Sequence, residues 1–92
     1  MAKNFRMITS EQANRTIQIQ LHGDFDGTSA HELANMLDDF SYSFARVAIN
    51  TDGLKTLHSF GLNVFNTKLK MLRRIPARIM FCGKYKNNFA EE

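Results

Sequence analysis

The chain has 92 residues, 43% of them hydrophobic, a composition that predicts one small folded domain and excludes an intrinsically disordered chain. The formal net charge of +3 is too small to indicate a nucleic-acid partner, and no apolar run approaches the roughly 18–20 residues of a transmembrane helix. The first residues lack the apolar segment of a signal peptide and Cys82 is the single cysteine, so we expect a cytoplasmic protein without disulfides.

The first part of the chain predicts a β-hairpin. Residues 5–10 suit a short edge strand, and residues 11–14 suit a polar turn. Residues 16–22 then alternate between apolar and polar side chains, which is the period of a half-buried strand. The apolar positions are Ile17, Ile19 and Leu21, and the polar ones are Gln18, Gln20 and His22. Two strands joined by so short a turn most simply pair antiparallel.

The first predicted helix follows a glycine-containing break at residues 23–27. Ser29 and Glu32 have the spacing of a capping box, so we expect Ser29 to cap this helix. Apolar residues then recur every three or four positions, at Ala30, Leu33, Leu37, Phe40 and Phe44. This stripe predicts one buried face, and His31 and Asp38 fall outside it on a solvated face.

The second half of the chain predicts a strand, a helix and a last strand. Residues 46–50 contain the unbroken apolar run Val47-Ala48-Ile49, typical of a parallel strand covered on both faces. Residues 51–53 have turn chemistry. Ser59 is then expected at the N-cap of a helix. The apolar stripe of this helix is Leu62, Phe65, Leu69 and Leu72.

The end of this second helix is predicted from basic residues and a proline. Lys68, Lys70, Arg73 and Arg74 suit the negative end of the helix dipole, and Ile75-Pro76 stops the helix. Residues 77–83 form the last predicted strand. For residues 84–92 a helical turn and a frayed tail both remain open.

The element order β-β-α-β-α-β predicts an α/β fold. It should form a mostly parallel four-stranded sheet with one antiparallel edge strand and with helices packed against it. In such sheets, sites gather where loops leave the carboxyl ends of strands. Here those loops are residues 23–28 and 52–59, each leading into a helix, with a third after Gly83.

The sequence gives little support for a catalytic or metal-binding motif, so we predict no enzymatic activity, no cofactor and no metal. The side chains available for a catalytic triad are Ser59, His58, His22, Asp24, Asp26 and Asp52. However, no nucleophile-elbow motif surrounds the serine. His22, Asp24 and Asp26 alternate as metal ligands do, but no second ligand cluster has a recognised spacing.

A basic cluster lies at residues 68–78, with Lys84 and Lys86. We interpret it as a solvated helix end, because no nucleic-acid reader motif accompanies it. Binding of nucleic acid or of a membrane surface through this cluster stays a distant alternative.

Three motifs, in order, resemble those of the STAS domain, named after sulfate transporters and anti-sigma factor antagonists. They are Gly23-Asp24-Phe25-Asp26 followed by Thr28, then Val47-Ala48-Ile49-Asn50, and then Ser59-Phe60-Gly61-Leu62. The resemblance covers residues 5–83 and agrees with the element order derived above. It implies that residues 1–92 form a single STAS-like domain.

This resemblance implies a protein-binding switch. Antagonists of this family bind a serine-kinase anti-sigma factor, which phosphorylates the serine that matches Ser59 and so releases the antagonist. The implied partner-binding residues are Asp24, Asp26, Thr28, His58, Ser59, Phe60 and Gly61. A phosphoryl group adds about −1.5 to −2 charges, which backbone N–H groups at a helix start can hold.

Two residues depart from the family pattern, since His58 replaces an acidic residue and Phe60 a small one. These changes favour the alternative of a non-phosphorylated STAS scaffold, or a subunit of a larger complex such as a lipid-transporting ABC system. Phe60 would then be a hydrophobic contact. Without the family, Ser59 is read simply as a helix cap, and Gly61 as a packing residue.

Overall fold

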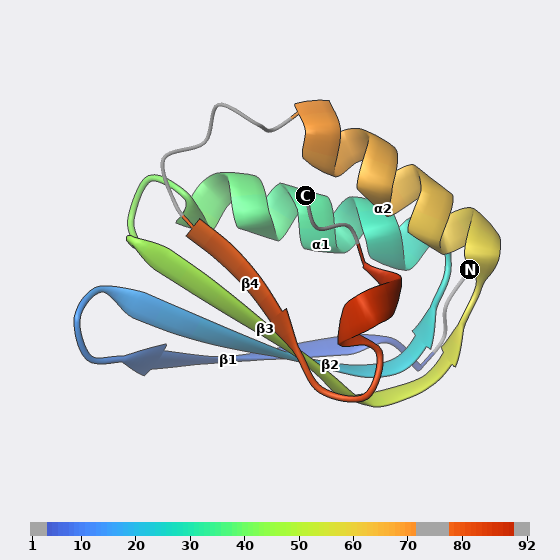
Figure 1. Cartoon of the computed structure of the whole chain (residues 1–92), viewed down its shortest axis with the longest axis horizontal. Helices are drawn as coiled ribbons and strands as arrows, with labels where there is room; N and C mark the ends of the chain where they lie inside the picture. The colour runs from blue at the N-terminus through green and yellow to red at the C-terminus, as the bar shows by residue number, and fades with distance from the viewer. Residues whose placement is uncertain (1–3, 72–77, 90–92) are drawn as a thin grey trace.

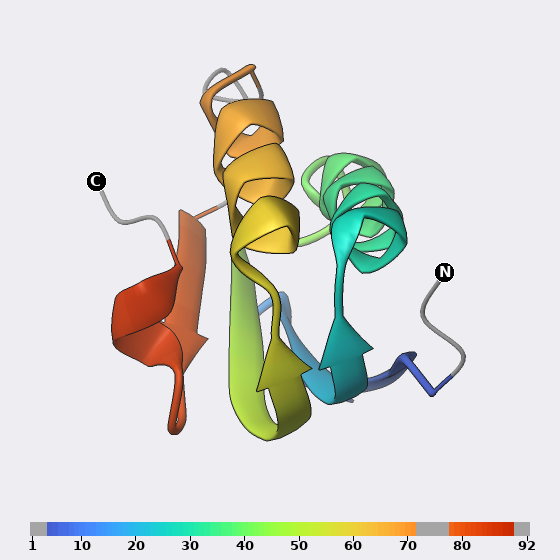
Figure 2. The same cartoon turned by 90° about the vertical axis from the view of Figure 1, so that its right-hand side faces the viewer.

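The computed structural model describes residues 4–71 and 78–89, which form a sheet with both helices on one of its faces (Figures 1 and 2). The elements are β1 (Arg6–Gln12), β2 (Thr16–Phe25), α1 (Gly27–Phe40), β3 (Arg46–Leu57), α2 (Ser59–Met71), β4 (Arg78–Cys82) and a 3-10 turn, η1 (Lys86–Asn88). The predicted order β-β-α-β-α-β is therefore confirmed.

The sheet has the strand order β1-β2-β3-β4. β1 pairs antiparallel with β2, whereas β2 with β3 and β3 with β4 are parallel. This confirms the mostly parallel sheet with one antiparallel edge. The hairpin between β1 and β2 turns through Asn14 and Arg15, which have φ angles of 62° and 57°.

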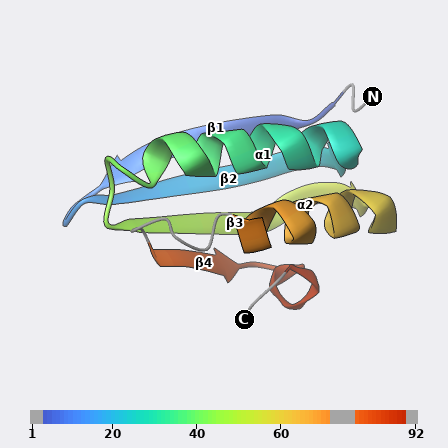
Figure 3. The ribbon, with the colours of Figure 1, turned by 90° about the horizontal axis from the view of Figure 1, so that it is seen from above.

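Both helices cover the same face of the sheet (Figure 3). Two right-handed crossovers that advance in the same direction along the sheet put their helices on one side. The prediction that the strand around Val47-Ala48-Ile49 is covered on both faces is therefore wrong. Ala48 lies in register with Gln18 and Met80 on the face without helices, which we call the open face, and is only partly buried.

The core lies between the sheet and the helices and contains a cluster of phenylalanine rings. Phe25, Phe65 and Phe89 meet edge-to-face with ring centroids 5.2–6.0 Å apart. Phe81 stacks on Phe89 at 5.0 Å. Phe89 is 1% exposed, so the open question about the tail is answered for the described residues 84–89 by a helical turn anchored in the core.

β2 and β3 continue further than the sequence predicts, because residues read as loops belong to strands. β2 runs through residues 23–25, and β3 runs through residues 51–57. The pairing of β2 with β3 shifts register twice, between Gln20 and His22 and between Gly23 and Asp24. Each shift places an extra residue in β3, and such bulges interrupt the alternation that identifies a strand.

Residues 51–53 were predicted to form a turn, but two of them tie the C-terminal segment to β3. Thr51 is buried, and its hydroxyl donates to the Cys82 carbonyl and accepts from the Tyr85 N–H, both at 2.9 Å. The Asp52 carboxylate accepts from the Lys84 N–H at 2.7 Å.

Some sequence-based predictions lie outside the described residues. They concern the end of the second helix at Ile75-Pro76 and the residues Leu72, Arg73, Arg74 and Ala77. Within the described part, Lys68 and Lys70 lie in the last turn of α2.

Candidate functional site

The two helices begin side by side at the carboxyl end of the sheet (Figure 2). A single residue, Asp26, separates β2 from α1, and a single residue, His58, separates β3 from α2. Because β2 and β3 are neighbours, the two helix starts are neighbours too. This agrees with the predicted position of the site, although the connections are much shorter than the predicted loops.

Asp26 caps α1. Its Oδ1 accepts from the Ser29 N–H at 3.0 Å, and the buried Ser29 hydroxyl lies 3.1 Å from the same oxygen. The expectation that Ser29 is the cap is therefore wrong, since Ser29 lies inside the first turn. The hydrogen bond from the Ser29 N–H is the main reason that the pKa of Asp26 is held below its usual value.

The starts of the two helices touch through glycines. A Cβ atom on Gly61 would lie 2.7–2.8 Å from backbone atoms of Asp26. A Cβ atom on Gly27 would lie 3.0 Å from the ring of Phe60. Gly61 is buried, and its lack of a side chain lets the two helix starts approach each other closely.

Phe60 is a large apolar residue that is exposed in this region, with a relative accessibility of 70%. Its ring borders an open hollow of about 410 Å³, which is lined by Asp26, Gly27, Thr28, His31, Phe60 and Val64. A partly apolar hollow beside an exposed aromatic ring is a suitable place for a side chain of a protein partner.

His31 and Val64 were missed as site residues by the sequence analysis. His31 is exposed, as predicted, but it also lines this hollow. The available signal was helical spacing, because His31 follows Gly27, and Val64 follows Phe60, by four residues. Residues four apart lie on the same side of a helix.

Ser59 is exposed at the first residue of α2. The first helical hydrogen bond runs from the Leu62 N–H to the His58 carbonyl at 3.0 Å, so His58 holds the N-cap position and Ser59 follows it. The predicted N-cap is thus displaced by one residue. His58 is exposed as well, and its N–H donates to the Phe25 carbonyl at 3.0 Å.

The other predicted site residues fall into two groups. Thr28 is exposed in the first turn of α1 and lines the hollow with Asp26 and Phe60. Asp24 does not line it, and its carboxylate instead accepts from the Thr56 hydroxyl at 2.7 Å. The structure therefore brings Asp26, Thr28 and Phe60 together, with Ser59 beside them.

Two further observations concern the described residues only. Over residues 4–71 and 78–89, no set of three His, Cys, Asp or Glu side chains is placed to hold a metal ion. Neither helix of this part of the chain is long and apolar enough to cross a membrane.

No protein-family model and no curated protein sequence matches the chain. Solved structures do match it. An antisigma-factor antagonist STAS domain from Rhodobacter sphaeroides has a TM-score of 0.70 and 17% identity, covering 97% of this chain and 95% of that chain.

A second match is the anti-sigma factor antagonist SpoIIAA in its unphosphorylated form, with a TM-score of 0.60 and 14% identity over 83% of this chain and 71% of that chain. The phosphorylated form of SpoIIAA, the Bacillus cell fate determinant, matches with a TM-score of 0.59 and 14% identity over 82% of this chain and 69% of that chain. Native Mglu has a TM-score of 0.66 and 10% identity over 83% of this chain, which spans only 23% of Mglu.

Proposed function

We propose that this chain, which has the fold of a STAS domain, is a non-enzymatic regulatory protein of the anti-sigma factor antagonist type. It acts in the cytoplasm, binds a serine-kinase anti-sigma factor through the starts of α1 and α2, and is switched by phosphorylation of Ser59. The STAS fold itself, expected from three sequence motifs, is confirmed by the solved structures.

The observation that carries this proposal is the position of Ser59. Its side chain is exposed at the start of α2, beside the exposed Phe60 ring and the capped start of α1. A kinase can reach such a hydroxyl without unfolding the domain. A partner that covers the Phe60 hollow would also detect a charge placed on the neighbouring residue.

Phosphorylation at this position fits the local electrostatics. The N–H groups of residues 59–61 precede the first helical hydrogen bond, and the first turn of α2 contains no acidic side chain. The positive end of the helix dipole therefore favours a phosphoryl group of about −1.5 to −2 charges. The surface of a bound partner would face this new charge together with the Asp26 carboxylate. The partner is then released because of charge repulsion and the cost of desolvating the phosphoryl group at the interface.

The structural neighbours support the proposal at a coarser level. The STAS neighbours are anti-sigma factor antagonists, and SpoIIAA has been solved both unphosphorylated and phosphorylated. The simplest inference from these structural neighbours is that this chain also has a regulatory role.

The test is to incubate the protein with ATP and the serine-kinase anti-sigma factors of the same organism, and to locate phosphate by mass spectrometry. We expect phosphate on Ser59, its loss in Ser59→Ala, and its retention in Ser43→Ala, which changes another exposed serine. Ser59→Asp should abolish binding of the kinase, whereas Ser59→Ala should preserve it. Phosphate that persists in Ser59→Ala, or its absence with every such kinase, contradicts the switch.

The exposure of Phe60 favours a second candidate function. A STAS subunit that is never phosphorylated, for example in a lipid-transporting ABC system, would use the same hollow with Phe60 as its anchor. In that case a pull-down recovers an ATPase subunit, Phe60→Ala abolishes the recovery, and Ser59→Asp leaves it unchanged.

A further inference from the structure

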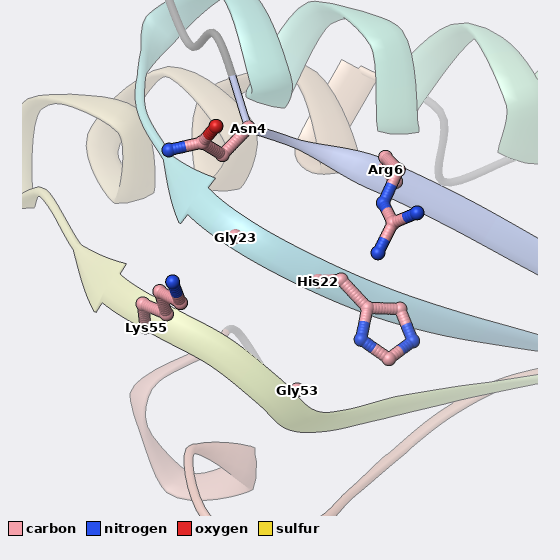
Figure 4. A pocket seen from close by; sticks show the side chains of 6 residues that line it. All are labelled: Asn4, Arg6, His22, Gly23, Gly53 and Lys55. Carbon is pink, nitrogen blue, oxygen red and sulfur yellow. The ribbon is translucent and has the colours of Figure 1, made fainter.

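A second hollow lies on the open face of the sheet, on the side away from α1 and α2 (Figure 4). It has a volume of about 340 Å³ and is lined by Asn4, Arg6, His22, Gly23, Gly53 and Lys55. Among these lining residues the charged or titratable side chains are all basic. We call this hollow the basic hollow.

Strand register brings the basic side chains together. Arg6 of β1 lies directly opposite His22 of β2, and the Cβ atoms of such cross-strand pairs are about 4.5–5.5 Å apart on one face. His22 in turn pairs with Gly53 of β3. In Figure 4 the Arg6 guanidinium points toward the His22 ring.

Lys55 reaches the same hollow because of a bulge. Gly23 pairs with Leu54 and Asp24 pairs with Thr56, so Lys55 is an extra residue of β3 without a partner in β2. Bulges re-aim side chains and are common beside functional sites. Here the bulge places a second full positive charge in the hollow that contains Arg6.

The absence of a side chain at Gly53 is what accommodates the imidazole. A Cβ atom on Gly53 would lie 2.8 Å from Cε1 of His22, so the ring occupies the space that any other residue would fill. The Nε2 atom of His22 is buried and has no hydrogen-bond partner among residues 4–71 and 78–89. A buried polar atom left unpaired is unfavourable, which makes it a natural contact for a ligand.

The geometry points to a binding site for a small phosphate-bearing anion in the basic hollow. The Arg6 guanidinium offers paired donors that match phosphate oxygens, and Lys55 adds a point charge. Nε2 of His22, at the wall of the hollow, adds a further hydrogen bond. The carboxylates that flank lining residues in the sequence are those of Asp24 and Asp52. Asp24 accepts from the Thr56 hydroxyl and Asp52 from the Lys84 N–H, both at 2.7 Å, and neither lines the hollow.

The size of the hollow limits the ligand. Pockets for small molecules start at about 300 Å³, so the basic hollow suits free phosphate or a small phosphomonoester. It lies on the opposite side of the sheet from Ser59, so this site does not depend on the proposed switch.

The test is to titrate the protein with inorganic phosphate and with glycerol phosphate, followed by isothermal titration calorimetry and by NMR. The ionic strength is held constant with a chloride salt. We expect saturable binding of at least one of them, with amide shifts centred on Arg6, His22 and Lys55. Tighter binding of glycerol phosphate identifies a phosphomonoester as the ligand, and equal binding identifies free phosphate.

Charge-neutralising variants decide whether the hollow is responsible. Arg6→Gln and Lys55→Gln should each weaken binding about tenfold, the effect of losing a hydrogen bond to a charged group. Lys70→Gln removes the same charge from an exposed position on α2 and should leave binding unchanged. Thermal unfolding of each variant verifies that it is folded. Absence of saturable binding, or an equal loss in all three variants, overturns the site.

Discussion

Gly61 of α2 lies directly against the backbone of Asp26, the residue that caps α1, and a Cβ atom there would come within 2.7 Å of it. This contact fixes the two helix starts relative to each other. It also holds Phe60 over Gly27, because Phe60 precedes Gly61 in the same turn. The proposed partner surface therefore depends on the close packing at a buried glycine.

The first prediction concerns this contact. Gly61→Ala should lower the free energy of unfolding by about 1–3 kcal/mol, because the added methyl meets backbone atoms that cannot rotate away. Urea unfolding followed by circular dichroism measures the loss. Asn63→Ala, at an exposed position of the same helix, is the control and should change stability by less than about 0.5 kcal/mol. Equal stability of Gly61→Ala and wild type would show that the helix starts can separate without cost.

The second prediction concerns pH and Asp26. Hydrogen bonding from the Ser29 N–H lowers the pKa of the folded Asp26 below the value of about 3.9 in an unfolded chain. The stabilisation is therefore fully present above about pH 4 and is lost as pH falls through the lower folded pKa. Urea unfolding of wild type and Asp26→Asn between about pH 2 and pH 6 should give a difference in stability that shrinks toward acid.

Asp26→Asn is informative because asparagine is also a good N-cap and does not titrate. Asp26→Ala removes the cap itself and should cost about 0.5–2 kcal/mol at neutral pH. If the difference between wild type and Asp26→Asn stays constant across the pH range, the capping interaction does not involve the charge of Asp26.

The sequence predicted the architecture well because local periodicity carries it. Alternation over residues 16–22 specifies a half-buried strand, and the apolar stripe that includes Leu62, Phe65 and Leu69 specifies a helix, whatever surrounds them. Whether helices cover one face of the sheet or both could not be predicted from local periodicity. Val47-Ala48-Ile49 has no alternation because the small Ala48 suits the open face as well as a buried one.

The two candidate sites also differ in whether local sequence or tertiary structure determines them. Ser59 and Phe60 could be located from the order of strands and helices, since helix starts follow carboxyl ends of strands. The basic hollow could not, because Arg6, His22 and Lys55 meet only through the register of three strands and a bulge in β3. Register depends on tertiary pairing, and residues 51–53 were predicted to form a turn although β3 continues through them.

The third prediction concerns the buried hydroxyl of Thr51. Thr51→Val keeps the shape of the side chain but leaves the Cys82 carbonyl and the Tyr85 N–H without this partner. We expect a loss of about 1–3 kcal/mol in the free energy of unfolding, because two partly buried backbone groups lose a hydrogen-bond partner. Thr67→Val, at an exposed site on α2, is the matched control and should be nearly neutral. A neutral Thr51→Val would mean that water replaces the hydroxyl.

The fourth prediction contrasts two phenylalanines with opposite roles. Phe89 is 1% exposed and packs on Phe25, Phe65 and Phe81, so Phe89→Ala should cost about 3–5 kcal/mol in chemical unfolding. Phe60 is 70% exposed, so Phe60→Ala should change stability by less than about 0.5 kcal/mol while abolishing partner binding. Should Phe89→Ala fail to fold, Phe89→Leu still reports a smaller loss. A large loss of stability in Phe60→Ala would place this ring in the packing of the helix starts, and its effect on binding would then no longer mark a contact surface.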